Sequence, residues 1–299
     1  MKLITFTHNE STRIGALRGG SVVDLNACDA ELPTDMVALL CGGDAMMQRA
    51  RAAADSGEVA LVLDDIQLHS PITAPRKIVA TGLNYMDHFN EVPEEIKKAA
   101  GFKIPEQPIL FNKQASSITG PYDPIDLPPE SVELDYEAEL AVVIGKTCRR
   151  VSKEDVPKVI AGYMVANDVS IRDWQRAAPT MMMGKCWDTH CPMGPALVTA
   201  DEVPEPEGLA VRLTVDGEQR QRFSTGDMLF DVATQIAYMS TAMTLEPGDI
   251  LLTGTSAGVG FFWPGGGLLT EGQVVRVDIE GLGHLENTVV KDPGISFIR

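Results

Sequence analysis

The chain is poor in basic residues. It contains 25 lysines and arginines against 42 aspartates and glutamates among 299 residues, so its formal net charge is -17. A surface with this charge repels phosphate backbones and anionic membranes at long range, which argues against nucleic acid and membrane partners. Long apolar runs are missing as well, because the stretch 140–144 is far shorter than the roughly 20 residues of a membrane-spanning helix.

Cysteine is also scarce. The five cysteines are scattered and have no C-x-x-C spacing, which favours reduced thiols over a disulfide framework or a zinc site. The first residues lack the apolar segment of about 7–15 residues that marks a secretory signal peptide. We therefore expect a cytoplasmic protein.

Several catalytic signatures are absent. The glycine-rich stretch 251–267 has neither the Lys-Ser/Thr end of a phosphate-binding loop nor the G-x-G-x-x-G pattern. H-E-x-x-H does not occur, which argues against zinc peptidases. The five histidines show no spacing that builds a two-histidine iron site, so an iron oxygenase is not expected.

Two regions of different character follow one another along the chain. Residues 1–72 resemble a small N-terminal α+β domain, with β-type runs at 2–6 and 13–25, the second split by a glycine pair, and a helix at 33–54. Residues 73–299 are richer in strands than in helices. Predicted strands cover 77–82, 139–145, 160–168, 209–217, 249–255 and 274–281, and predicted helices cover 92–100, 171–178 and 230–243. The sequence therefore predicts a β-dominated α+β fold with helices at its margins.

An acidic run is the strongest chemical signal. On a continuous strand, Glu133, Asp135, Glu137 and Glu139 would share one face. Like charges raise one another's pKa unless a cation lies among them, so the run is a candidate platform for a hard metal ion. The alternative is a solvated face of an edge strand. Asp168 ends another predicted strand, and three carboxylates suit Mg²⁺ or Mn²⁺ better than zinc.

Polar residues that follow this aspartate are candidates for binding a substrate. Ser170 and Asp173 resemble a capping box that starts a helix, on which Arg172 and Gln175 share a face. Lys185 is flanked by a tryptophan and a proline-rich turn, so it is a candidate for a partly buried cation that holds a carboxylate. The alternatives are an exposed arginine and glutamine, and a lysine whose stem packs on the tryptophan.

A histidine–glutamate pair is a candidate for activating water. His88 and Glu91 are spaced i,i+3, so on one helical turn the carboxylate can orient the imidazole. By itself this spacing is common, and the alternative is a solvated pair. Thr253 and Thr255 could offer hydroxyl or backbone donors to a carboxylate in a tight loop.

Six separated segments together resemble the fumarylacetoacetate hydrolase family. They are GLNYMDHFNE, LDYEAELAVVIG, GYMVANDVSIRDWQ, GKCWDTHCPMGP, MTLEPGDILLTGTSAGVG and QVVRVDIEGLGHLENTVV, in the family's order across roughly residues 75–290. The resemblance implies a mixed β-roll around a divalent cation, a homodimer or a dimer of dimers, and a small N-terminal domain over 1–72 beside a catalytic domain over 73–299.

The resemblance also implies roles for single residues. The metal ligands would be Glu137, Glu139 and Asp168, binding Mg²⁺ or Mn²⁺, with Ca²⁺ able to replace them in crystals. The catalytic residues would be His88 and Glu91, on a segment that behaves as a lid in relatives, together with Lys185. The substrate-binding positions would be Tyr85, Arg172, Gln175, Lys185 and Thr255. One departure is Leu83, where many relatives have arginine or lysine.

The implied reaction starts from a small 2-oxo acid chelated by the ion. The leading expectation is a Mg- or Mn-dependent hydrolase that cleaves a C–C bond of an acylpyruvate or fumarylpyruvate, in catabolism of an aromatic compound, with water activated by His88. The alternatives on the same site are an oxaloacetate decarboxylase and a 2-hydroxyhepta-2,4-diene-1,7-dioate isomerase. A further alternative is a relative that binds dicarboxylates without turnover, against which the presence of both His88 and Glu91 argues.

Overall fold

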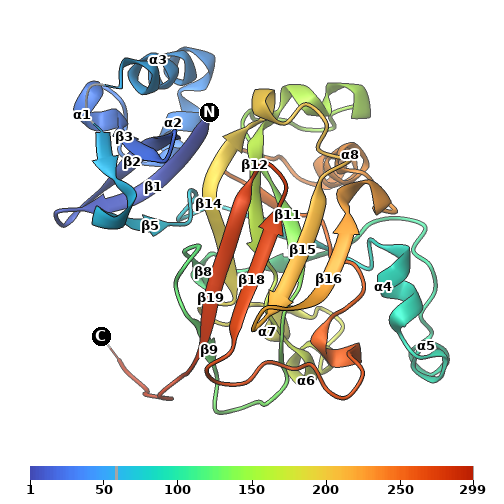
Figure 1. Ribbon diagram of the computed structural model, residues 1–299. Helices are drawn as coiled ribbons and strands as arrows, with labels where there is room; N and C mark the ends of the chain where they lie inside the picture. Colours follow the sequence, from blue (N-terminus) through green and yellow to red (C-terminus); the bar gives the residue numbers. More distant parts are fainter. Residues whose placement is uncertain (58–59, 299) are drawn as a thin grey trace.

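Short strands form most of the framework of the molecule (Figure 1). The structure is a computed structural model that describes residues 1–57 and 60–298. The strands are β1 (Lys2–His8), β2 (Ser11–Arg18), β3 (Ser21–Asp24), β4 (Ala60–Val62), β5 (Gln67–His69), β6 (Ile78–Gly82), β7 (Ile109–Lys113), β8 (Ile118–Thr119), β9 (Ile125–Leu127), β10 (Leu134–Asp135), β11 (Ala138–Ile144), β12 (Ile160–Asn167), β13 (Ser170–Ile171), β14 (Cys191–Thr199), β15 (Ala210–Val215), β16 (Glu218–Ser224), β17 (Ile250–Leu252), β18 (Val274–Ile279) and β19 (Gly283–Lys291).

These strands assemble into two main sheets. The larger sheet has twelve strands; its main path runs β4-β3-β2-β1-β14-β12-β11-β17-β6-β7, with β5 beside β1 and β8 beside β14. The second sheet runs β16-β15-β18-β19-β9, and β10 pairs with β13. Neighbours in both sheets are mostly antiparallel, but β17 pairs with β6 and β19 with β9 in parallel. The predicted β-dominated fold of mixed strands is confirmed.

The helices are short and lie at the margins of the sheets (Figure 1). They are α1 (Leu25–Cys28), α2 (Met36–Cys41), α3 (Gly43–Ser56), α4 (Met86–Glu91), α5 (Glu94–Ala100), α6 (Arg172–Arg176), α7 (Met182–Lys185) and α8 (Val232–Ala242), with 3₁₀ turns at 63–65, 115–117, 153–158, 200–202, 225–227 and 260–262. Within the described residues, no helix combines the length and apolar character needed to cross a bilayer.

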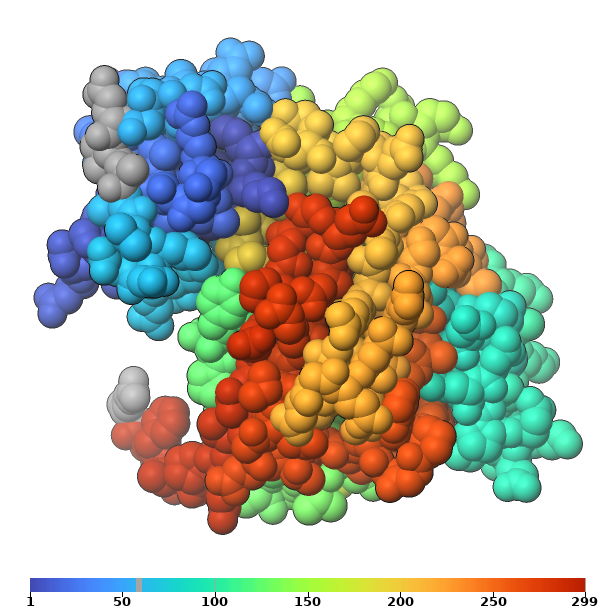
Figure 2. Space-filling view, in the orientation of Figure 1, coloured from blue at the N-terminus to red at the C-terminus, as the bar shows by residue number. Residues whose placement is uncertain are grey.

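The N-terminal region adds strands to the larger sheet. β1, β2 and β3 form an antiparallel meander, and the glycine pair lies at the β2–β3 turn as predicted. The single helix expected over 33–54 is two helices, because Gly43 has φ +64° and breaks the helical path between α2 and α3. β1 pairs with β14 through Lys2↔Val198 and Leu3↔Leu197. In the space-filling view this region is the blue lobe beside the yellow atoms of β14 (Figure 2); a domain boundary at residue 72 stays a prediction.

The main core lies between the two sheets. On β11, Leu140 and Val142 face a cluster that includes Leu213 and Val277 of the second sheet. The alternate residues of β11, such as Val143, belong to a second buried cluster that reaches the N-terminal region. Since a strand buried on both faces has almost no freedom to move, β11 and its neighbour β12 are rigid supports for the polar residues at their ends.

Candidate metal centre and active site

The acidic run 133–139 is not one continuous strand. β10 ends at Asp135 and β11 begins three residues later, at Ala138. The Asp135 carboxylate accepts hydrogen bonds from the backbone N–H of Tyr136, Gly260 and Phe261, at 2.8, 2.7 and 3.0 Å. The condition for the predicted common face, one continuous strand over 133–139, is therefore not met. Asp135 still pairs with Ser170 in the short β10–β13 ladder.

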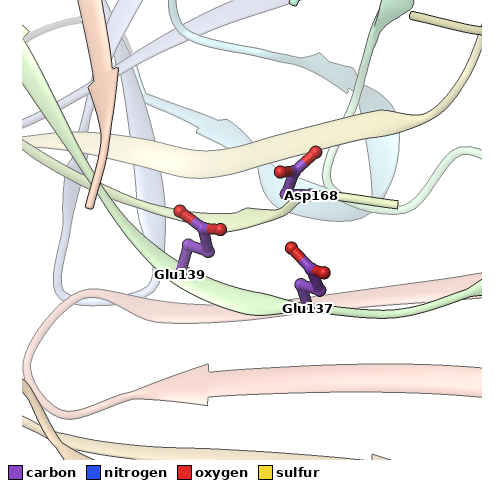
Figure 3. Close-up of side chains that lie close together, drawn as sticks. All are labelled: Glu137, Glu139 and Asp168. Atoms are coloured by element: carbon purple, nitrogen blue, oxygen red, sulfur yellow. The ribbon is translucent and has the colours of Figure 1, made fainter. Parts of the chain in front are cut away.

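Three carboxylates nevertheless meet as the family resemblance implies. Glu137, Glu139 and Asp168 each offer an oxygen, and these oxygens lie within 4.8 Å of one another. Figure 3 shows Glu137 and Glu139 pointing from the β11 segment toward Asp168. The Asp168 backbone N–H donates to the Glu137 carbonyl at 2.9 Å, which locks the two segments together. The alternative of a solvated face is wrong for these residues, since all three are buried.

Buried cations surround this acidic centre. Lys185 Nζ donates to Glu137 Oε2 at 2.7 Å and to Asp168 Oδ2 at 2.8 Å. Arg172 joins Glu137 Oε1 (2.6 Å) to Asp135 Oδ2 (2.7 Å). The alternative of Arg172 as an exposed surface residue is therefore wrong, and Lys185 is buried as well. α6 and α7, which carry these two side chains, hold them against strand ends rather than in solvent.

The charges around the three carboxylates are not evenly balanced. Burial would raise the pKa of Glu137, but Lys185 and Arg172 outweigh it and lower that pKa to about 2. Burial, Asp168 and Glu137 together raise the pKa of Glu139 well above its ordinary value. The ionised form of Glu139 therefore lacks sufficient positive charge nearby to stabilise it. Three buried carboxylate oxygens with one poorly neutralised member fit a hard divalent ion such as Mg²⁺ or Mn²⁺.

The His88–Glu91 pair forms on α4 as its spacing predicts. His88 Nδ1 and Glu91 Oε1 are 2.6 Å apart, and the other oxygen of Glu91 accepts from the Gly258 backbone N–H at 2.8 Å. The side chains are 13% and 15% exposed, so the alternative of a fully solvated pair is wrong. The charge of His88 contributes to lowering the pKa of Glu137, which indicates that the imidazole lies near the acidic centre.

The predicted substrate-binding residues lie around the same centre and differ in whether their polar groups already have hydrogen-bond partners. Tyr85 is buried, and among the described residues its hydroxyl has no hydrogen-bond partner. The same holds for Arg172 Nη2, within the part of the chain that the structure describes. Gln175 Oε1 accepts from Arg172 at 2.9 Å, and Thr255 Oγ1 accepts from Gln221 at 2.9 Å. Unpaired buried donors of this kind mark places where a ligand or water must supply the acceptor.

Two local predictions are wrong. The capping box on Ser170 and Asp173 does not form: across the described residues of α6, no side chain caps the N-terminus. Ser170 Oγ donates instead to the Asp168 carbonyl at 2.9 Å, and Asp173 accepts from Ser131. Thr253 is not a free donor, because its hydroxyl donates to the Leu140 carbonyl at 3.1 Å.

Lys113 is a member of the centre that the sequence interpretation missed. Its Nζ lies 2.7 Å from Asp168 Oδ1 and also contacts the Lys185 carbonyl oxygen. Burial alone would lower the pKa of Lys113, but the Asp168 carboxylate raises it above its ordinary value. Strand parity indicates its burial but not its partner, since Lys113 lies two residues after the buried Phe111 on β7 and so shares its face.

The fold, the acidic centre and the sequence agree on one family. Residues 77–290 match the family described as Fumarylacetoacetate (FAA) hydrolase, C-terminal. This match covers more than half of the chain, and the chain therefore belongs to the fumarylacetoacetate hydrolase family.

Relatives cover nearly the whole chain. A Xenopus laevis protein named mitochondrial oxaloacetate tautomerase fahd2 is 44% identical over 296 residues, covering 97% of this chain and 90% of that protein. The structure of a fumarylacetoacetate hydrolase from Exiguobacterium antarcticum is 36% identical with a TM-score of 0.83, covering 98% and 100% of the two chains. Maleylpyruvate hydrolase from Sphingobium sp. SYK-6, in complex with manganese(II) and pyruvate, is 32% identical with a TM-score of 0.80, covering 97% and 99%.

Proposed function

We propose that this protein is a divalent-metal-dependent enzyme that interconverts the enol and keto forms of oxaloacetate. The observation that carries the proposal is the buried group of Glu137, Glu139 and Asp168, with the His88–Glu91 pair beside it. The 44% identity to a protein named oxaloacetate tautomerase favours oxaloacetate over the acylpyruvates expected from sequence. Its name also includes the word mitochondrial, so placement of this chain in the cytoplasm stays a prediction.

The three carboxylates would hold the ion and leave part of its coordination shell for the substrate. Bound there, a divalent ion supplies Lewis acidity that stabilises the negative charge on the 2-oxygen of the substrate. Glu137, Glu139 and Asp168 would supply three ligands, and Mg²⁺ takes about six oxygens. Room would therefore remain for the 1-carboxylate and the 2-oxygen of a 2-oxo acid.

The proton transfers fall to residues of the chain. In ketonisation, the 2-hydroxyl of the enol loses a proton and carbon 3 gains one. His88, held by Glu91 at 2.6 Å, would deliver and remove the proton at carbon 3. Lys185 would stabilise charge at the 2-oxygen, because its ammonium is buried beside Glu137 and Asp168.

The test is direct. Purified protein with Mg²⁺ or Mn²⁺ should accelerate the loss of the ultraviolet absorbance of enol-oxaloacetate, and removal of the ion with a chelator should abolish the acceleration. Carbon dioxide release is followed in the same samples to separate tautomerisation from decarboxylation. The proposal fails if the rate equals that of free metal ions, or if carbon dioxide release accounts for the whole signal.

Hydrolysis of a C–C bond is the second candidate. The His88–Glu91 pair favours it, because an imidazole oriented by a carboxylate can also activate water for attack on carbon 4. The similarity to maleylpyruvate hydrolase supports it. Pyruvate formation from maleylpyruvate or acetylpyruvate, at rates above those on oxaloacetate, would favour this reaction over tautomerisation.

A further inference from the structure

Arg220 is a buried arginine that the proposed reaction does not use. It lies on β16 where the register with β15 shifts: Leu213 faces Gln221, and in the described ladder the next pair skips Arg220. An extra residue of this kind is a β-bulge, which re-aims the side chain and is frequent beside active sites. The Arg220 side chain is 11% exposed, whereas Arg222 on the same strand is exposed.

The guanidinium of Arg220 is incompletely paired. Its Nη2 lies 2.9 Å from Glu218 Oε2, and its carbon lies 4.6 Å from the centre of a Trp263 ring. Nε and Nη1 are buried and have no hydrogen-bond partner among residues 1–57 and 60–298. Three of the five N–H protons of a guanidinium belong to these two atoms. Since buried N–H groups normally find an acceptor, Arg220 points to an acceptor that the chain itself does not provide.

The strand that carries Arg220 also contributes to the candidate site. Gln221 Nε2 donates to Thr255 Oγ1 at 2.9 Å, and its oxygen accepts from the backbone at the start of β11. Phe223 packs edge-on against Tyr85 with 5.0 Å between ring centres. β16 is therefore a wall of the site rather than a remote surface strand.

Further contacts place the backbone of Arg220 next to Gly258, the residue whose N–H bonds to Glu91. Gly258 lies so near the Arg220 carbonyl that a Cβ would be 2.1 Å from its oxygen, and the Gly258 N–H donates to Glu91. The Tyr136 hydroxyl donates to the Gly258 carbonyl at 3.1 Å. Burial raises the pKa of Tyr136, while Arg220 and Arg172 both lower it. Tyr136 is therefore within electrostatic reach of both guanidiniums, one in the acidic centre and one on β16.

We propose that Arg220 binds the distal carboxylate of a dicarboxylic 2-oxo acid, an inference that rests on the proposed function. One end of such a substrate binds at the acidic centre, and the carboxylate at the other end would supply the acceptor that Arg220 Nε and Nη1 lack among the described residues. Arginine suits this role because its planar guanidinium pairs with carboxylates through several N–H groups. A monocarboxylic acid of similar shape leaves those N–H groups unpaired, so Arg220 selects dicarboxylates.

The test compares two unreactive acids that share a 2-hydroxy acid end. L-malate carries a distal carboxylate and L-lactate does not, and each is titrated into the Mg²⁺-loaded protein by calorimetry. Arg220→Met keeps an apolar stem over Trp263 and should weaken malate binding about 10- to 100-fold, with lactate binding changed less than about twofold. Arg220→Lys should fall between the two proteins. The matched control is Arg222→Met, which removes the same charge from an exposed position of β16 and should change neither affinity.

The outcomes of these titrations either support or overturn the role of Arg220. Equal weakening of malate and lactate, no weakening of either, or an equal effect of Arg222→Met overturns the role of Arg220. If thermal melting shows that Arg220→Met is unfolded, the malate-to-lactate ratio of Arg220→Lys decides, since lysine keeps the charge but not the planar geometry. Turnover of oxaloacetate by the unaltered protein is measured separately, so that failure of the proposed function is distinguished from failure of the Arg220 assignment.

Discussion

The acidic centre and the His88–Glu91 pair are held by the chain in opposite ways. The proposed ligands Glu137, Glu139 and Asp168 lie at the ends of strands buried on both faces and are themselves buried. The pair lies on α4, a six-residue helix, and Glu91 reaches the glycine-rich loop through its hydrogen bond to Gly258. The first arrangement suits a fixed ion, and the second suits a group that must exchange protons. The comparison teaches that ion binding and proton transfer should be separable by mutation.

The largest effect is expected from a change in the strand-held centre. Asp168→Asn keeps the shape but removes a ligand charge, so Mn²⁺ binding and turnover should both fall at least about 10³-fold. Binding is measured by calorimetry and turnover with enol-oxaloacetate. The control is Glu133→Gln, because Glu133 belongs to the same acidic run but pairs with Arg176 at the surface. Normal Mn²⁺ binding by Asp168→Asn would contradict the ligand assignment.

Changes on α4 should lower turnover without weakening ion binding. His88→Ala should leave Mn²⁺ affinity within about twofold and lower the turnover rate by about 10²- to 10⁴-fold, the usual range for loss of a general acid–base group. Glu91→Gln should have a smaller effect, since Glu91 acts by orienting the imidazole. Retained turnover in the His88 variant would mean that another residue transfers the proton.

Stability should follow the same division between buried and exposed pairs. Lys113→Met leaves Asp168 without one of its buried partners and should lower the free energy of unfolding by about 3–5 kcal/mol. Lys146→Met breaks the exposed pair with Asp44 and should have no measurable effect. Urea unfolding of both variants checks this. Equal stabilities would indicate that Lys113 is not needed to hold Asp168.

The smallest effect concerns pH. Burial, Asp168 and Glu137 raise the pKa of Glu139, so this carboxyl retains a proton at a pH where an ordinary glutamate has lost it. An ion must displace that proton, and Mn²⁺ affinity should therefore fall about tenfold for each pH unit below the pKa of Glu139. Calorimetry in buffers of different ionisation enthalpy counts the released proton. An affinity that is independent of pH would show that Glu139 is already ionised.

Local spacing pointed to candidate residues of the site, and the family resemblance chose among them. The i,i+3 spacing of His88 and Glu91 and the alternation of Glu137 and Glu139 are short-range patterns, and both groups come together in the structure. The bonds from the backbone of residues 260 and 261 to the Asp135 carboxylate span more than a hundred positions, and no local pattern predicts them. Lys113 was missed for the same reason, because its partner Asp168 is brought to it by the sheet.

The prediction of the strands was limited in the same way, because local patterns do not report which strands pair in the sheet. β11 and β12 were predicted from short β-type runs of mostly apolar residues, and both strands are largely buried. β14, a central strand, was missed because it contains Pro192 and Pro195, which argue against an interior strand. Its ladder with β12 is irregular here, since the register shifts between Tyr163 and Val165. Tertiary pairing at this shift accommodates residues that propensity alone would exclude.

The pairing of β1 with β14 has a consequence for shortened forms of the protein. β14 lies inside the sheet because β1 covers part of its outer edge. A fragment starting after residue 72 would present bare N–H and C=O groups along that edge, a template for other molecules to join strand to strand. We therefore expect a fragment without the N-terminal region to self-associate more readily than the whole chain.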